Sequence, residues 1–196
     1  QGSSTINAVD GNGFGVGNWK HPAYDDSTWA SGPSELGYGD GPFNTALQFG
    51  PDPLNKPITT YFRTSFGATQ PEIDQLHELV LNLQRDDGAV VYLNGRQVAQ
   101  ANLPLGTVSA STTANLNEFS TDRVVMAPSN LVAGVNYLAV EVHQVSSASN
   151  GLVMDAELTG NTLPSLAPVV YTLRAINTQG ESTATTSFTV RDQPTN

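Results

Sequence analysis

The sequence predicts an all-β sandwich followed by a C-terminal β-hairpin. Several short segments alternate apolar and polar residues, which is the period of a half-buried strand. The 196 residues include 18 Gly and 12 Pro, which interrupt the chain at frequent turns and disfavour long helices. One dipeptide, Asn94-Gly95, lies between two apolar runs and is the strongest short-range signal for a hairpin. These three observations together indicate short antiparallel strands packed in two layers.

The segment 84–100 is predicted to be the central hairpin of the sandwich. Asn-Gly suits a two-residue type I′ turn, in which both residues have positive φ. The register that follows has four facing pairs: Val90–Ala99, Val91–Val98, Tyr92–Gln97 and Leu93–Arg96. Facing side chains share one side of a sheet. Both sides therefore carry apolar residues, as expected of an inner strand.

The remaining elements follow in chain order. Residues 1–17 are expected to form an N-terminal arm or edge strand. Within the sandwich, 18–160, the segment 18–41 is a loop-rich lead-in in which Trp19 and Trp29 pack as anchors. Strands with alternating apolar residues are predicted over 58–68, 77–84, 123–126, 136–144 and 151–160. The polar interval 101–122 is expected to be an extended loop with a short strand.

The C-terminal part differs from the rest. A linker, 161–168, precedes a hairpin over 169–190 and a tail, 191–196. This hairpin resembles the last two strands of a bacterial immunoglobulin-like domain. An isolated hairpin is marginally stable in water. It is therefore expected to pack on its own sandwich, to belong to structure completed elsewhere, or to join the sheet edge of a neighbouring molecule.

Charge excludes some classes of partner. The formal net charge of −10 would repel phosphate backbones and anionic lipids, so neither nucleic-acid binding nor membrane insertion is expected. The chain has no cysteine, which rules out disulfides and thiolate metal sites. An acidic chain of this kind suits an extracellular or cell-surface location, which is the location we expect.

Five blocks of sequence carry a family resemblance. They are YDDSTWASGPSELGYGDG, TYFR, RDDGAVVYLNGRQVA, LVAGVNYLAVEVHQ and LVMDAELTG, between Trp19 and Gly160. This pattern resembles the galactose-binding-like jelly roll that recurs in large secreted bacterial proteins, and is similar to the sugar-binding jelly rolls of β-galactosidase-type glycosidases. The resemblance implies a non-catalytic fold used for carbohydrate binding, adhesion and interdomain packing. Binding residues vary between such domains, so it implies no particular ligand.

Two pairs of acidic residues are candidate calcium ligands. Asp86 and Asp87 lie in an Asp-Asp-Gly turn, where carboxylates and carbonyls can supply several oxygens to Ca²⁺. The favoured alternative is that one Asp caps backbone amides while the other is solvated. Asp155 and Glu157 lie one pleat apart on one strand face, and resemble the acidic C-terminal strand of calcium-binding jelly rolls.

Five other residues are candidates for ligand binding. Tyr38 and Asp40 lie in a Gly-rich segment, and Tyr92 lies in the central hairpin; an aromatic face with nearby carboxylates suits a sugar ring. Glu141 and His143 share a strand face, as a Glu-x-His pair that can act as acid and base or as metal ligands. For this pair, a hydrogen-bonded polar patch is the favoured interpretation.

Three functions are compatible with these features. The first is a non-catalytic extracellular module that binds a glycan or a neighbouring protein surface, with structural calcium. The second is a self-assembling surface subunit joined by strand exchange through its terminal segments. The third is an accessory domain of a secreted hydrolase. The sequence shows no nucleophile motif, so we expect no enzymatic activity.

Overall fold

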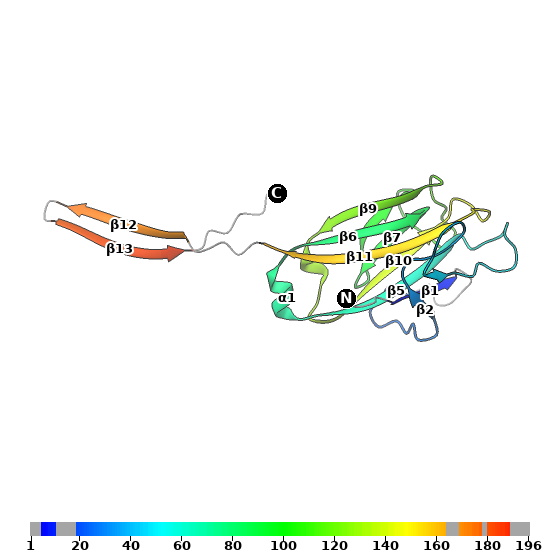
Figure 1. Cartoon of the computed structure of the whole chain (residues 1–196), viewed down its shortest axis with the longest axis horizontal. Coiled ribbons are helices and arrows are strands. Elements are labelled where there is room, and N and C mark those ends of the chain that lie inside the picture. Colours follow the sequence, from blue (N-terminus) through cyan, green and yellow to red (C-terminus); the bar gives the residue numbers. More distant parts are fainter. Residues whose placement is uncertain (1–4, 11–18, 164–168, 178–179, 189–196) are drawn as a thin grey trace. The chain divides into compact units, whose positions relative to one another are not determined.

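The computed structural model confirms the predicted all-β sandwich and C-terminal hairpin (Figure 1). It describes residues 5–10, 19–163, 169–177 and 180–188. The chain divides into two compact units, Gln1–Thr162 and Leu163–Asn196. The first unit is the sandwich, in which two sheets form the two layers.

One layer is a six-stranded sheet in which every neighbouring pair is antiparallel. Its strands, in spatial order, are β2 (Ala30–Pro33), β1 (Thr5–Asp10), β5 (Thr59–Ala68), β10 (Gly134–His143), β7 (Gly88–Leu93) and β8 (Arg96–Ala101). β1 lies between two other strands, so it is an inner strand rather than the expected arm or edge strand.

The other layer is a five-stranded sheet. Its strands, in spatial order, are β4 (Thr45–Ala46), β3 (Leu36–Tyr38), β11 (Leu152–Thr162), β6 (Leu76–Asp86) and β9 (Phe119–Met126). The short β3–β4 pair is parallel and the other pairs are antiparallel. In Figure 1, β9, β6 and β11 lie side by side in this layer.

The main hydrophobic core fills the space between the layers. The alternation predicted for β10 holds, because its even-numbered residues from Leu138 to Val142 enter this core. Other buried members are Leu36, Phe62, Leu81, Leu83, Val91, Leu152 and Met154. Burying apolar side chains of this size from both sheets is the dominant stabilising contribution to such a sandwich.

A second cluster covers the outer face of the six-stranded sheet. Trp19 and Trp29 pack there with Tyr61 and Tyr92, which confirms that the tryptophans act as packing anchors. Arg63 fixes the segment that carries them, because its buried guanidinium donates to the carbonyls of residues 21 and 22 and pairs with Asp26. The 19–29 segment thus closes this face of the sheet.

The central hairpin forms with the predicted turn but only half of the predicted register. Asn94 and Gly95 both have positive φ, at 51° and 82°, as a type I′ turn requires. Tyr92–Gln97 and Leu93–Arg96 pair as predicted. The other two predicted pairs are wrong, because the register shifts and Val91 faces Ala99 instead of Val98. The extra residue on β8 is a β-bulge, which a strict count from the turn does not anticipate.

Several local elements differ from expectation. The helix α1 (Gln70–Gln75) begins at a capping box in which Thr69 and Glu72 exchange hydrogen bonds, and Thr-x-x-Glu is the sequence signature of this motif. β9 begins at Phe119, four residues before the predicted start. β2 and β3 form inside the predicted lead-in 18–41. A single 3₁₀ turn, η1 (Pro128–Asn130), precedes β10.

The second unit contains the hairpin of β12 (Val169–Asn177) and β13 (Gly180–Phe188), which pair along their whole length. Strand exchange through the terminal segments, which include the 169–190 hairpin, concerns contacts between molecules and stays a prediction. Within the described part of the chain, no helix has the length and apolar character needed to span a membrane.

Candidate functional site

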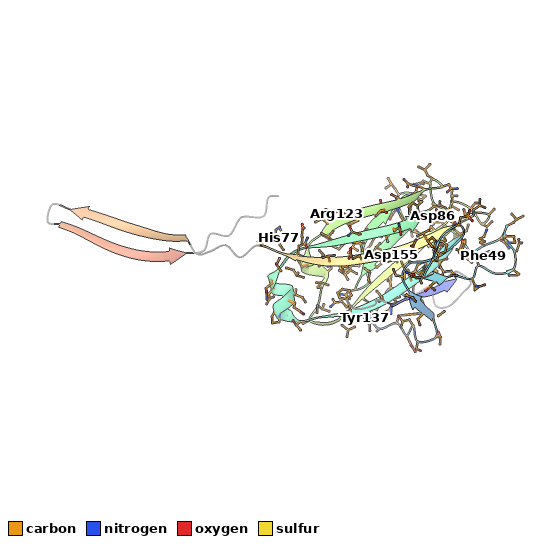
Figure 2. All side chains as sticks on the ribbon, viewed as in Figure 1. Phe49, His77, Asp86, Arg123, Tyr137 and Asp155 are labelled. Carbon is orange, nitrogen blue, oxygen red and sulfur yellow. The ribbon has the colours of Figure 1, made fainter. Side chains whose placement is uncertain are left out.

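A cleft of about 420 Å³ lies on the outer face of the five-stranded sheet. Register pairs Phe119 with Asp86, Asp86 with Val153, and Val153 with Gly37. Since facing residues share one side of a sheet, these residues form one row across four strands. Figure 2 shows Asp86 near one end of the sandwich, with His77 toward the other end. We call this recess the outer-face cleft.

Three aromatic residues and four polar ones are among those that line the outer-face cleft. They are Tyr38, Phe43, Phe119, Glu35, Asp40, Asp86 and Asn150. Phe119 is 58% exposed on the edge strand β9, while the ring of Phe43 lies against β3 at the opposite side. Three strand spacings separate β3 from β9, which is about 14 Å. The carboxylates and the amide therefore lie between, or next to, two separated aromatic walls.

Gly37 lets Phe43 reach this position. A Cβ built on Gly37 would lie 2.5 Å from Cε1 of Phe43 and 2.3 Å from the carbonyl oxygen of Leu152. No real side chain tolerates such distances, so only glycine allows the ring and the neighbouring strand to approach this closely. Gly39, at the tip of the same turn, has a φ of +112°, which also favours glycine.

Asp86 is the electrostatic centre of the cleft. Partial burial raises the pKa of its carboxyl to about 7, and the hydrogen bond with Asp87 and the negative charge of Asp87 act in the same direction. The positive charge of Arg85 opposes this shift but does not cancel it. Asp86 therefore changes its charge near neutral pH, whereas an exposed Asp does so near pH 4.

Asp87 has a structural role in the fold. Its side chain is fully buried, and its two oxygens accept 2.8 Å hydrogen bonds from the backbone amides of Glu118 and Val145. This is the amide-capping alternative, although the amides belong to distant segments and not to the turn itself. The described residues contain no group of three or more His, Cys, Asp or Glu side chains placed to hold a metal ion. Calcium at Asp86 and Asp87 thus stays a prediction without geometric support.

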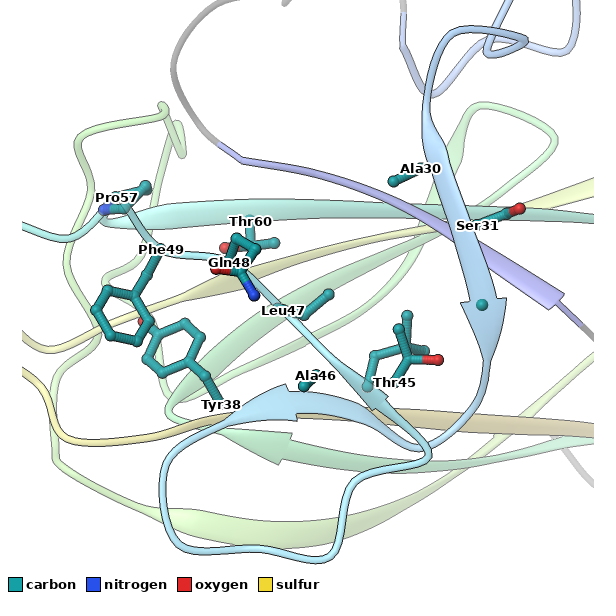
Figure 3. A pocket seen from close by; sticks show the side chains of 12 residues that line it. Ala30, Ser31, Tyr38, Thr45, Ala46, Leu47, Gln48, Phe49, Pro57 and Thr60 are labelled. Atoms are coloured by element: carbon teal, nitrogen blue, oxygen red, sulfur yellow. The ribbon is translucent and has the colours of Figure 1, made fainter. Parts of the chain in front are cut away.

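Tyr38 lies in β3 and lines two recesses. It is 7% exposed, its ring packs on Phe49 with centroids 4.9 Å apart, and its buried hydroxyl has no hydrogen-bond partner among the described residues. Burial, followed by the charges of Asp86 and Asp87, raises its pKa to about 12. Tyr38 borders the outer-face cleft on one side. On the other it borders a recess of about 250 Å³ between β2 and the segment 45–49 (Figure 3).

Tyr92, Glu141 and His143 belong to the other sheet and are buried beneath the Trp19 cluster. The Tyr92 hydroxyl donates to Glu141 Oε1 at 2.7 Å, and His143 Nε2 lies 3.6 Å from Glu141 Oε2. His143 Nδ1 lies 2.8 Å from the carbonyl oxygen of Thr112 and 3.0 Å from Thr59 Oγ1. These contacts form a buried polar network that ties the 102–116 loop to the sheet.

Asp155 and Glu157 line a separate recess of about 460 Å³ beside β11. Ser34 Oγ donates to Asp155, and Asn82 Nδ2 donates to Glu157 at 3.1 Å. Figure 2 labels Asp155 in the middle of the sandwich. Both carboxylates thus have neutral hydrogen-bonding partners, and neither lies in the outer-face cleft.

The fold brings three of the sequence-predicted site residues to the outer-face cleft and places the others in the Tyr92 network, at Asp87 and in the recess beside β11. Tyr38, Asp40 and Asp86 meet at the outer-face cleft. Four other cleft residues were not predicted: Glu35, Phe43, Phe119 and Asn150. They come from separate turns and an edge strand, and only the pairing of β3, β11, β6 and β9 makes them neighbours. The one available signal was Phe119, whose side chain is apolar at an outward-facing position of a strand.

Comparison with known proteins gives the fold but no family. No protein-family profile matches the sequence, and no curated protein matches it. Among solved structures, a glycosyl hydrolase family 2 member from Bacteroides cellulosilyticus has a TM-score of 0.51 and 11% identity. The match covers 94% of this chain and 28% of the Bacteroides cellulosilyticus chain. A β-glucuronidase from an uncultured Clostridium sp. has a TM-score of 0.50 and 13% identity, with coverages of 94% and 32%.

At these identities the similarity shows the fold alone. The chain spans less than a third of the length of either structure. The fold of this chain is therefore similar to part of larger chains that are named as glycoside hydrolases.

Proposed function

We propose that this chain is a non-catalytic β-sandwich domain of a larger extracellular carbohydrate-active protein, and that its outer-face cleft binds a saccharide. The observation that carries the proposal is the placement of Phe43 and Phe119 at the two sides of a cleft whose other lining groups are carboxylates and an amide. The accessory role agrees with the third function that the sequence allowed.

The chemistry of the cleft suits a sugar. A sugar ring presents C–H groups that pack on an aromatic face, and hydroxyls that donate to carboxylates. Phe119 offers such a face in water, because more than half of its surface is exposed. Asp40 is exposed and Glu35 is half-buried, so both are accessible as acceptors. Asn150 adds an amide that can donate and accept.

The accessory role is supported by size. The structures that resemble this chain are about three times its length or more, so a domain of this kind is one part of a larger protein there. The net charge of −10 and the absence of cysteine are compatible with the proposed extracellular location. A neighbouring protein surface is the alternative partner for the same cleft.

One observation favours a second function, which is hydrolysis of a glycosidic bond. A glycosidase needs one carboxyl group that stays protonated near neutral pH and a second that is ionised. Burial raises the pKa of Asp86 to about 7, and Glu35 and Asp40 line the same cleft. Assays with aryl glycosides test this function. Turnover by the wild type that is lost in Asp86→Asn would refute the proposed non-catalytic role.

Binding is tested with the full chain on a glycan array, followed by titration of the best saccharide. Phe119→Ala should weaken that binding by about tenfold, because a stacking contact of about 1.5 kcal/mol is lost. Val125→Ala is the matched control, since Val125 is also exposed on β9 but does not line the cleft. Repeating the array with a chelator tests the calcium prediction. Absence of binding to every saccharide would refute the proposed function.

A further inference from the structure

We propose that residues 156–162 of β11 are a docking site for an extended segment of a partner protein that alternates apolar and basic residues. The segment would add to the five-stranded sheet as a further strand, which is a recurring mode of peptide recognition. The inference goes beyond saccharide binding, because it concerns a different surface of the sandwich. It follows from an unpaired sheet edge, from an apolar recess beside that edge, and from the charges next to both.

β11 has a partner strand along only part of one side. On that side β3 pairs with β11 no further than Met154, whereas on the other side β6 pairs with it as far as Thr162. In the described part of the chain, no other strand pairs with 156–162, and no loop backbone forms a hydrogen bond with this stretch. Because the backbone groups of alternate residues point to opposite sides of a strand, every second residue there has an unpaired N–H and C=O. We call 156–162 the free edge of β11.

The free edge lacks the features that usually keep sheet edges from pairing with another chain. Such edges are blocked by Lys, by Pro, by a bulge or by a covering loop. Residues 156–162 contain neither Lys nor Pro, and their register with β6 is regular as far as Asn161. Most of them are exposed, namely Glu157, Thr159, Gly160, Asn161 and Thr162. The edge is therefore open to an added strand over about 23 Å.

An apolar recess lies between the free edge and the other layer of the sandwich. Its volume is about 460 Å³, and its lining combines Ala156 and Leu158 of β11 with Phe66 of β5 and Leu138 of β10. β5 is also unpaired on one side beyond Arg63, where its pairing with β1 ends. The recess thus opens between two sheet edges, and it is far larger than the about 30 Å³ of a water molecule. Side chains of an added strand can therefore occupy it.

The two faces of the free edge favour different side chains in the added strand. Facing residues share one side of a sheet, so residues opposite Ala156 and Leu158 would enter the recess, which favours apolar side chains. A residue opposite Glu157 would lie on the outer face, where Asp155 also lies. The donors to these two carboxylates are a neutral amide and a neutral hydroxyl, and neither carboxylate forms an ion pair with another described residue. Basic side chains are therefore favoured at the outer positions.

A second copy of this chain fits the free edge less well than a basic segment does. It carries the same acidic residues next to its own free edge and the same net charge of −10. Like charges across a strand pair are destabilising, and a large net charge of one sign opposes self-association. We therefore assign the edge to a partner segment of opposite charge.

Isothermal titration calorimetry of the full chain compares three peptides of equal length, each long enough to span the free edge. One alternates Lys and Val, one alternates Glu and Val, and one has the composition of the first with its Lys and Val residues in separate blocks. We expect the Lys–Val alternation to bind at least about tenfold more tightly than either of the others, because it alone suits both faces of the edge.

Two N-methylated forms of the Lys–Val peptide test whether a strand is added. One carries methyl groups on the amides of its Lys residues and the other on the amides of its Val residues, so each form loses the donors of one edge. Since only one edge of an added strand faces β11, one form should lose at least about tenfold in affinity, and the other should keep most of it. Peptide binding should also slow hydrogen exchange at alternate amides of 156–162.

A charge reversal on β11 tests the preference for basic residues. Glu157→Lys should weaken binding of the Lys–Val peptide at least about fivefold and strengthen binding of the Glu–Val peptide, because the sign of the nearest charge changes. Asp52→Lys is the matched control, since Asp52 is also exposed but does not line the recess, so it should leave both affinities nearly unchanged. Circular dichroism and urea unfolding confirm that each variant is folded.

Three outcomes would overturn the inference. Equal affinities of the two N-methylated forms would show that no strand is added to β11. Equal affinities of the three unmethylated peptides, or no binding of any, would remove the basic segment as the occupant. A dimer of the chain alone in light scattering, with its 156–162 amides already protected from exchange, would assign the edge to a second copy. None of these results bears on saccharide binding, which is measured separately at the outer-face cleft.

Discussion

The Tyr92 hydroxyl donates a 2.7 Å hydrogen bond to Glu141 across the β7–β10 pair, beneath the ring of Trp19. Both residues are buried. Burial raises the pKa of Tyr92, and the hydrogen bond with Glu141 acts in the same direction. The Tyr92 hydroxyl therefore supplies a hydrogen-bond donor to the buried carboxylate of Glu141.

Tyr92→Phe should lower the free energy of unfolding by about 1–3 kcal/mol, because it leaves a buried acceptor without its partner. Urea unfolding measures the change. Tyr137→Phe is the control: it removes a hydroxyl from the same sheet face, but Tyr137 is only half-buried, so a change within about 0.5 kcal/mol is expected. An equal loss in both variants would contradict the assigned role of the Tyr92–Glu141 bond.

Arg63→Met should destabilise the sandwich by about 3–5 kcal/mol, since Asp26 and the loop carbonyls lose a buried charged donor. Arg63→Lys should recover only part of this loss, because one ammonium group cannot match the planar guanidinium fork. The emission of Trp19 and Trp29, which belong to the segment that Arg63 holds, should shift to the red. Arg123→Met, at an exposed position of β9 (Figure 2), serves as control; a similar effect there would refute the prediction.

The pKa of Asp86 predicts a pH-dependent stability. Because the folded-state pKa is raised from 3.8 to about 7, the folded protein retains a proton that the unfolded chain releases. The stabilising contribution is thus complete below about pH 4 and lost as the pH rises through about 7. A fully buried group would give about 4 kcal/mol, and solvent screening at this half-buried site reduces the figure to about 1–2 kcal/mol.

This contribution is measured as the difference in unfolding free energy between wild type and Asp86→Asn at about pH 5 and about pH 8. Carboxyl groups with a lowered pKa make stability rise with pH, which is the opposite of the effect of Asp86. Glu72 is one of them, because its hydrogen bonds with Thr69 lower its pKa. Both proteins contain these groups, so the difference between them reports on Asp86. The free energy of unfolding of the wild type, relative to that of Asp86→Asn, should be lower at about pH 8 than at about pH 5. A difference that is constant with pH would show that the pKa of Asp86 is not raised.

Gly37→Ala should destabilise the sandwich by about 1–3 kcal/mol, because the added methyl group overlaps Phe43 and the β11 backbone. It should also weaken saccharide binding, since the Phe43 ring has to move. Gly67→Ala is the matched control: Gly67 also lies in a strand, but a Cβ there meets nothing within 4 Å. That substitution should be neutral or slightly stabilising. Equal effects at both positions would contradict the proposed close packing at Gly37.

The strands and their inward faces were predictable because each depends on local alternation. In β10, the alternating pattern predicts that Leu138, Val140 and Val142 point to one side of the sheet and Ala139, Glu141 and His143 to the other, and the first set enters the core. The bulge at Val98 was not predictable from the turn alone, because no residue near Asn94-Gly95 signals an extra position in β8. Helix α1 was missed although Thr69 and Glu72 supply a capping box, since the segment is too short to show helical periodicity.

The candidate site was harder to predict, because it depends on contacts between distant segments. The pattern Asp86-Asp87-Gly88 indicates that one carboxylate caps backbone amides, and Asp87 does so, but the amides of Glu118 and Val145 that it accepts from lie in distant segments. Phe43 and Phe119 are far apart in sequence and line the same cleft only because of the spatial order of β3, β11, β6 and β9. The local patterns of a single sequence do not indicate the spatial order of strands in a sheet.

Phe43, Asp40 and Asn150 lie in turns, whereas the residues that hold the two layers together lie within strands. The proposed recognition surface is therefore encoded partly by positions outside the strands, although Asp86 and Phe119 belong to β6 and β9. A library that randomises the turn positions alone would explore new sugar preferences while the thermal tolerance of the scaffold stays almost constant.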